Sequence, residues 1–338
     1  MKKILSYFLV ILVILFSIPI IFTKSFTSKE TVSKIEENKS ETNSEDNKIE
    51  NYDYGQYNTI KLYHYKTGEV EELGLDEYVK GVISAEMPAS YEQEALNAQA
   101  LVARTYTIFK IKTKGGEHPN GADICDNYAC CQAWISKNDR LEKWNEEDRE
   151  NYWNKIETAV NSTKGKIVTY NDEPINAFFH SNSGGTTENP SDVWGGTGYA
   201  YLQSVETAGE VNYDQYSSEA TFTKEEFTSK MKEKHSDFNI NWDEQECIKI
   251  EEYTTGGRVK TIKIGNQTLS GVEVRTIYGI RSAKFTIEID GDNVKFSVTG
   301  YGHGVGMSQT GADSMAKEGA SCEDIIKHYY TNVEIKNL

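Results

Sequence analysis

The chain is organised around the stretch GVISAEMPAS, residues 81–90, which leads into a long apolar run ending at Tyr106. Glu86 lies among apolar residues, just before a proline and the start of a helix. Burial disfavours the charged form of a carboxyl group, so this environment should raise the pKa of Glu86. A raised pKa is the usual preparation of a general acid at neutral pH. We therefore predict that Glu86 is the centre of the chemistry.

Two helices should flank this glutamate. The first has Asp76 as its N-cap and ends at Pro88. The second carries apolar residues at helical spacing over residues 95–109, and should be largely buried. Gln99 and Arg104 are polar positions inside that second helix. Either core hydrogen bonds satisfy them, or they support the site at Glu86.

The rest of the folded part, residues 55–338, alternates strand and helix patterns. Residues 60–73 read as a β-hairpin, and a second hairpin turns at Asp290-Gly291. The pattern changes over about 211–265, which indicates a peripheral subdomain. We expect an α+β fold, mainly antiparallel sheet with helices, with two lobes and a substrate groove.

The N-terminus predicts a membrane anchor over residues 1–23. Lys2 and Lys3 precede an uncharged run over residues 4–22, which as a helix spans roughly 28 Å, about one bilayer core. The lysines should stay in the cytoplasm, which places the remainder outside. A cleaved signal peptide is the alternative, although the run has no small-residue cleavage site. Residues 24–54 are polar and should form a flexible linker.

Charge and cysteine content limit the possible functions. The formal net charge is -16, and no basic stripe is present, which argues against nucleic acid as a partner. The five cysteines are an odd number, and three of them fall within seven residues. This spacing does not resemble a disulfide framework.

His118, Cys125, Cys130 and Cys131 are four potential metal ligands in one short segment. Zinc takes cysteine and histidine tetrahedrally, and four protein ligands would close the site, which makes it structural rather than catalytic. The alternative is a disulfide between Cys125 and one of the adjacent cysteines, because the domain should lie outside the membrane.

Four segments together resemble the stage II sporulation protein D family, whose relatives include modifiers of cell-wall amidases. They are SAEMP at residues 84–88, AQALVARTY at 98–106, HSNSGG at 180–185 and YGHGVGMSQ at 301–309. They follow the family's order, and the resemblance covers roughly residues 60–333. Where many relatives have histidine before the second cysteine, this chain has Cys130, which is still a metal-capable side chain.

The resemblance implies a lytic transglycosylase that acts on peptidoglycan during engulfment of the forespore. The implied substrate is glycan strands already stripped of stem peptides by a partner amidase. The implied partners are that sporulation cell-wall amidase and membrane proteins of the engulfment machinery. The implied location is the mother-cell membrane facing the forespore, with a single-pass anchor and an extracytoplasmic catalytic domain.

A single recognisable carboxylate suits this chemistry. Ordinary glycosidases need two carboxylates. In lytic cleavage Glu86 alone would protonate the leaving oxygen and then accept the proton of the sugar's own C6 hydroxyl, which closes onto C1. Residues expected to bind substrate, or alternatively to act as structural hydrogen bonders, are Gln99, Arg104, His180, Ser183, Tyr201, His303, Ser308 and Gln309.

Two further expectations concern charge and the rival functions. Denuded glycan retains the lactyl carboxylate of muramic acid, so the groove should be less negative than the whole, through Arg104, Arg275 or Arg281. The main rival is a non-catalytic glycan-binding protein that activates a cell-wall amidase. A zinc hydrolase would require an open metal site, and three cysteines beside one histidine make that a poor match.

Overall fold

The computed structural model of the protein describes residues 54–114 and 117–338, and this part of the chain is a mixed α+β structure. The strands in it form five small sheets, most of whose neighbouring strands are antiparallel. The prediction of an α+β fold with mainly antiparallel sheet is therefore confirmed.

The anchor predicted over residues 1–23, and nearly all of the linker predicted over 24–54, lie outside the described residues and stay predictions. Within residues 54–114 and 117–338, none of the helices has the length and apolar character that crossing a bilayer requires.

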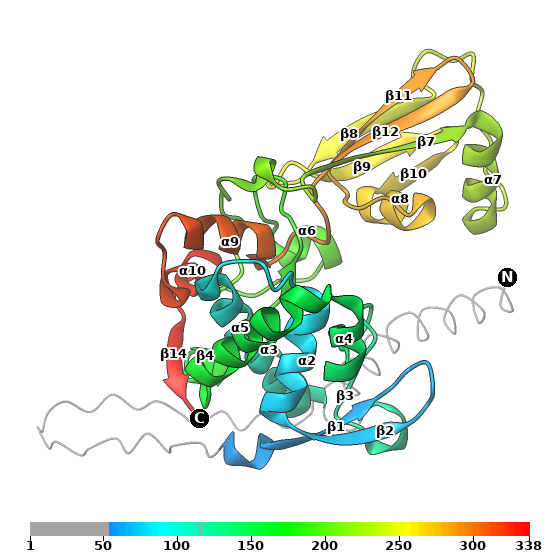
Figure 1. Ribbon diagram of the computed structural model, residues 1–338. Coiled ribbons are helices and arrows are strands. Elements are labelled where there is room, and N and C mark those ends of the chain that lie inside the picture. The colour runs from blue at the N-terminus through cyan, green and yellow to red at the C-terminus, as the bar shows by residue number, and fades with distance from the viewer. Residues whose placement is uncertain (1–53, 115–116) are drawn as a thin grey trace, which may run out of the picture. The chain divides into compact units, whose positions relative to one another are not determined.

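Helix α3 (Gln93–Lys114) is the central element of the first hydrophobic core (Figure 1). Every residue from 95 to 108 is buried, including the polar Asn97, Gln99 and Arg104, as expected for a helix that is covered on all sides. The elements around this core are α2 (Leu75–Glu86), α4 (Lys137–Lys143), α5 (Glu146–Ser162), α9 (Gln309–Lys317), α10 (Cys322–Tyr329), β1 (Thr59–Tyr63), β2 (Val70–Gly74), β3 (Ile124–Cys125), β4 (Lys166–Tyr170), β5 (Glu173–Pro174) and β14 (Glu334–Asn337). Helices α2, α5, α9 and α10 and strand β4 all contact α3.

The predicted hairpin is present as antiparallel β1 and β2, and the predicted helix before Pro88 is present as α2. The predicted N-cap is wrong, however. Gly74 occupies the N-cap position of α2, and Asp76 lies in its first turn. There its carboxylate faces the positive end of the helix and pairs with Arg104, so a tertiary contact replaced the local capping bond.

A second hydrophobic core lies in a separate set of elements. They are β7 (Ser217–Thr223), α7 (Lys224–Lys234), β8 (Ile248–Tyr253), β9 (Val259–Ile264), β10 (Gln267–Ser270), α8 (Gly271–Tyr278), β11 (Phe285–Asp290) and β12 (Asn293–Thr299) (Figure 1). Phe227 stacks on Tyr278 with ring centres 4.5 Å apart, and Phe296 packs beside both rings. The second core extends to Val298, beyond the 211–265 range that the sequence indicated for a subdomain.

Two short strands bring distant glycine-rich segments together. Strand β6 (Phe179–His180) pairs in parallel with β13 (Met307–Ser308), so that His180 lies opposite Ser308. The sequence motifs at residues 180–185 and 301–309 are thereby neighbours, although more than a hundred residues separate them in the chain.

Candidate functional site

Glu86 is the last residue of α2, where the apolar face of the helix has brought it to the edge of the first core. Its side chain is half-buried and accepts one hydrogen bond, from the backbone N–H of Ala133 at 2.6 Å. Burial raises the pKa of Glu86 to about 7, and the Ala133 hydrogen bond opposes this shift without cancelling it. The negative end of the helix also favours the protonated acid. Glu86 is therefore prepared to give and take a proton near neutral pH.

Glu86 opens onto a solvent-open groove with an empty volume of about 760 Å³. The groove is lined by Ala85, Glu86, Met87, Pro88, Ala89, Ser90, Tyr91, Arg140, Trp144, Tyr152, Ser181, Gln215, Tyr301 and Gln309. Within this lining Glu86 is the only carboxylate and Arg140 the only cation. The remaining polar groups are tyrosine and serine hydroxyls and glutamine amides, and they lie beside aromatic rings and small apolar side chains. This combination suits a neutral or anionic polar ligand such as a sugar.

The two polar residues inside α3 have different surroundings. Gln99 is fully buried, and its Oε1 accepts a hydrogen bond at 3.3 Å from Gln309, which lines the groove. Arg104 is also fully buried, but its guanidinium donates to Asp76 at 2.9 Å and to the carbonyl oxygen of Thr163 at 2.8 Å. Gln99 thus holds the groove residue Gln309 through a hydrogen bond. Arg104 instead links α2, α3 and the end of α5 and does not line the groove.

Ser183 and Ser308 are held by a glutamate that sequence reasoning missed. Glu210, in the short 3-10 helix η3 (Glu210–Asn212), is buried and accepts hydrogen bonds from the backbone N–H of Ser183 and of Gly185, each at 2.7 Å. The hydroxyls of Ser183, Ser308 and Thr310 also donate to its carboxylate. Glu210 therefore fixes two glycine-rich motifs to each other, and neither serine lines the groove.

The two motif histidines lie in an aromatic cluster. The rings of His180 and His303 are 5.7 Å apart, and Trp194, in α6 (Pro190–Trp194), lies 5.1 Å from His303. Burial and nearby arginines lower the pKa of both histidines, that of His303 to about 3, so both are neutral. Tyr201 is buried elsewhere, and its hydroxyl accepts a hydrogen bond from the backbone N–H of Asn176.

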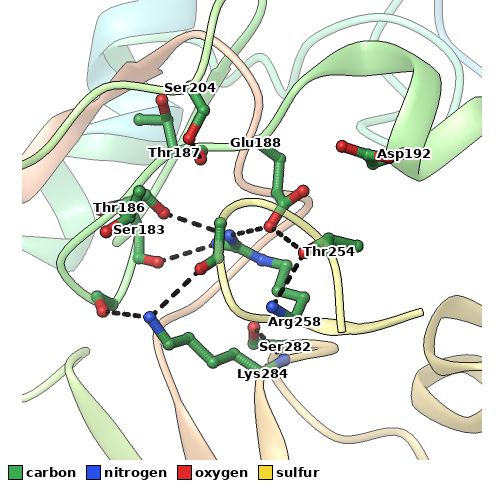
Figure 2. Close-up of polar contacts among 12 residues, drawn as sticks. Ser183, Thr186, Thr187, Glu188, Asp192, Ser204, Thr254, Arg258, Ser282 and Lys284 are labelled. Atoms are coloured by element: carbon green, nitrogen blue, oxygen red, sulfur yellow. Dashed lines mark hydrogen bonds and ion pairs between the residues drawn. The ribbon is translucent and has the colours of Figure 1, made fainter. Parts of the chain in front are cut away.

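A buried ion pair connects the second core to the 183–188 loop (Figure 2). Arg258, from the turn between β8 and β9, donates to Glu188 at 3.2 Å and to the carbonyl oxygen of Ser183 at 2.8 Å. Lys284 donates to the carbonyl oxygen of Gly184 at 2.9 Å. A Cβ at Gly304 would lie 2.3 Å from the Arg258 guanidinium, so only glycine leaves room for it.

Of the three arginines expected to reduce the negative charge of the groove, none lines it. Arg104 is in its buried pair, and Arg275 lines a smaller hollow beside Arg258 and His303. Arg281 stacks over Tyr301 at 5.2 Å, and Tyr301 is the groove residue. The cation within the lining is Arg140 instead.

The four predicted metal ligands converge. The ligand atoms of His118, Cys125, Cys130 and Cys131 all lie within 4.8 Å of one another, and Nε2 of His118 is 3.4 Å from Sγ of Cys131. All five cysteines are free thiols. Hydrogen bonding from Cys131 lowers the pKa of Cys125 to about 6, which favours a thiolate there. Three sulfurs and one imidazole at this spacing fit a tetrahedral ion such as zinc, and none of the four lines the groove.

The ligand segment also reaches the acid. Ala133, two residues after Cys131, supplies the N–H that Glu86 accepts, and Gln132 donates to Tyr78 and Thr107 of helices α2 and α3. Trp134 lies so close to α2 that a Cβ at Gly81 would be 2.1 Å from its Nε1. A metal ion bound here would therefore hold the segment that positions the Glu86 carboxyl.

Comparison with known proteins supports the motif assignment. Residues 63–170 match the SpoIID family model, described as Stage II sporulation protein. The chain is 38% identical over 279 residues to Stage II sporulation protein D of Bacillus subtilis (strain 168), covering 82% of this chain and 78% of that protein. The chain belongs to the stage II sporulation protein D family.

Two further relatives are consistent with this membership. Stage II sporulation protein D of Bacillus amyloliquefaciens is 36% identical, over 82% of this chain and 78% of its own length. The Amidase enhancer of Bacillus subtilis (strain 168) is 29% identical, over 75% of this chain but 39% of its own length.

In this family member the groove wall formed by Arg140, Trp144 and Tyr152 was not found from sequence. These residues lie in and around α4 and α5, in a segment rich in charged residues that reads as a solvated surface helix pair. The signal available was the presence of tryptophan and tyrosine among those charges, since large aromatic residues on polar helices often mark a binding surface.

Proposed function

We propose that the protein is a lytic transglycosylase that cleaves the bond between N-acetylmuramic acid and N-acetylglucosamine in denuded peptidoglycan strands during sporulation engulfment. The observation that carries this proposal is the groove lining, in which Glu86 is the only carboxylate and has a pKa of about 7. Hydrolysis by the usual route needs a second carboxylate to activate water or attack C1. Cleavage by the substrate's own hydroxyl does not.

In this reaction Glu86 enters protonated. Its proton passes to the glycosidic oxygen as the bond from that oxygen to C1 breaks, releasing N-acetylglucosamine as the leaving group. The C6 oxygen of the muramic acid residue then bonds to C1, and its proton returns to the Glu86 carboxylate. The product is a 1,6-anhydro sugar, no water is consumed, and the acid is regenerated. A pKa near the working pH suits both proton transfers.

The other groove residues support a sugar ligand. Tyr91, Trp144, Tyr152 and Tyr301 contribute aromatic rings to the lining, against which pyranose rings can pack. Gln309 is oriented by its hydrogen bond to Gln99. Binding roles for His180, Ser183, Tyr201, His303 and Ser308 stay predictions. The structure gives Ser183, Ser308 and Tyr201 internal hydrogen-bond partners instead.

The test is Glu86→Gln, assayed on denuded glycan strands with the products identified by mass spectrometry. The wild type should release fragments whose muramic acid ends lack one water, and Glu86→Gln should reduce the rate by about 10²- to 10⁴-fold. Glu77→Gln is the matched control, because Glu77 lies on the same helix and forms only a surface ion pair with Lys80. Anhydro products at the wild-type rate from Glu86→Gln would exclude Glu86 as the acid.

A second candidate function is a non-catalytic glycan-binding activator of a cell-wall amidase. The similarity to the Amidase enhancer of Bacillus subtilis favours it. It predicts that the wild type binds denuded glycan without releasing anhydro ends, and that it increases product formation by an added amidase. Glu86→Gln should then leave that stimulation unchanged.

Three further features belong to the proposal. Residues 1–23 would anchor the protein in the mother-cell membrane, with the catalytic domain outside the cytoplasm and facing the forespore. A sporulation cell-wall amidase and membrane proteins of engulfment would be its partners. His118, Cys125, Cys130 and Cys131 would hold a structural zinc ion, which would cross-link the segment that carries Ala133.

A further inference from the structure

Arg140 differs from most other arginines in the described chain. Arg104 and Arg258 each form a buried ion pair, and Arg149 and Arg281 each donate to a backbone carbonyl. The Nε–H of Arg140 is buried without a hydrogen-bond partner, and the same holds for Arg104 and Arg258. Arg140 differs from those two because its guanidinium forms no ion pair within residues 54–114 and 117–338. Burial lowers the pKa of Arg140, and no neighbouring carboxylate opposes this shift. A half-buried guanidinium without a carboxylate partner is costly, so it indicates a missing anion.

The groove holds this guanidinium in a defined position. Arg140 extends from α4 and stacks on the Trp144 ring, with 5.0 Å between the guanidinium carbon and the ring centre. Trp144 is fixed in turn by an edge contact with Tyr152, at 5.4 Å. A stacked guanidinium keeps its edge available for hydrogen bonding, and that edge matches the geometry of a carboxylate.

The charge of the groove indicates what the acceptor is. Arg140 and Glu86 are the only charged side chains in the lining, although the whole chain has a net charge of -16. With Glu86 protonated, as the proposed acid must be before cleavage, the lining carries a net positive charge. The groove is therefore complementary to an anionic ligand, whereas the surrounding protein repels one.

We propose that Arg140 is a specificity residue that binds the free lactyl carboxylate of a muramic acid residue in the groove. This inference rests on the proposed function, because it takes glycan strands as the ligand. A stem peptide converts the lactyl carboxylate into a neutral, bulkier amide, so Arg140 distinguishes denuded from peptide-bearing strands. Discrimination arises because the amide leaves the half-buried guanidinium without its anion.

The test measures binding without cleavage, by calorimetry, using the Glu86→Gln protein and tetrasaccharides of alternating N-acetylglucosamine and N-acetylmuramic acid. One set keeps its lactyl carboxylates, and the other has them converted to methylamides. The carboxylate form should bind about 10- to 100-fold more tightly. Adding Arg140→Gln should reduce this ratio to about one, and Arg140→Lys should retain part of it.

Lys137→Gln is the matched control, because it removes the same charge from the same helix while Lys137 stacks over Trp153, outside the groove lining. It should keep the ratio. Equal weakening of both ligands by Arg140→Gln, or an equal affinity of the Glu86→Gln protein for both ligands, would overturn the proposal. Failure of the proposed function appears separately, as wild-type protein that releases no anhydro ends while its carboxylate-dependent binding persists.

Discussion

Charged groups have different surroundings in the groove and in a second region, the loop junction. We define the loop junction as the buried contacts among Ser183, Glu188, Glu210, Arg258 and Ser308. In the junction, Glu188 faces Arg258, and Glu210 accepts hydrogen bonds from two backbone amides and three hydroxyls. In the groove, Glu86 accepts a single hydrogen bond and Arg140 forms no ion pair with the described residues.

This difference distinguishes charged groups that stabilise the fold from charged groups that are available to a ligand or a reaction. Buried charges with partners hold loops in place, because breaking the pair leaves a charge that water cannot reach. Partly buried charges without an ion-pair partner make the folded state less stable, and they persist where a ligand or a reaction supplies what is missing. The junction shapes the motif loops, and the groove keeps its acid and its cation available.

The largest effect should come from breaking the junction. Arg258→Met leaves Glu188 without its cation and removes the donor to the Ser183 carbonyl, so the free energy of unfolding in urea should fall by about 3–5 kcal/mol. Lys260→Met, in the same hairpin, removes only an exposed ion pair with Glu252. This substitution should change the free energy of unfolding by less than about 1 kcal/mol. Equal effects of the two substitutions would show that the junction pair is no stronger than a surface pair.

Removal of a bound metal ion should have the second-largest effect on stability. With free metal at about 100 to 1,000 times its dissociation constant, a chelator should lower stability by about 3–4 kcal/mol. Hydrogen exchange should increase at residues 118–134, including the Ala133 amide that Glu86 accepts. Cys125→Ser should abolish the sensitivity to chelator, and Cys322→Ser, outside the cluster, should preserve it. A chelator without effect on the Ala133 amide would contradict the link between metal and acid.

A smaller effect should appear in the pH dependence of stability. The pKa of Glu86 is about 7 when folded against 4.5 ordinarily, so the folded state holds the proton more tightly. The stability that the protonated Glu86 contributes to the folded state is therefore fully present below about pH 4.5 and is lost as the pH rises to about 7. The loss should be about 1–3 kcal/mol, because the side chain is partly exposed. Urea unfolding of Glu86→Gln should lack this decline, and a decline identical to that of the wild type would assign it to another group.

The smallest effect on stability should come from Arg140→Gln. Because Arg140 forms no ion pair in the described chain and its Nε–H lacks a partner, the substitution should change the free energy of unfolding by no more than about 1 kcal/mol. Melting temperatures of Arg140→Gln and Arg258→Met, measured under the same conditions, check the contrast between the two arginines. A loss at Arg140 as large as that at Arg258 would remove the distinction between groove and junction.

Local sequence patterns predicted much of this structure. The hairpin of β1 and β2 and the helix before Pro88 depend on neighbours in the chain, and both are present. The four predicted metal ligands also fall close together in the sequence, and they converge. The wrong N-cap at Asp76 has the opposite cause, since its partner Arg104 lies 28 residues away.

The sequence by itself determined the α+β class, the apolar setting of Glu86 and the segment of potential metal ligands, because each depends on periodicity or short spacing. Only the tertiary structure decided which polar groups face the groove. The pairing of β6 with β13 and the carboxylate of Glu210 turned several motif residues inward, while Arg140, Trp144 and Tyr152 came to the groove from a surface-like segment. Long-range contacts decide whether a polar side chain forms hydrogen bonds within the protein or stays available to a ligand. The periodicity of the sequence does not reveal these contacts.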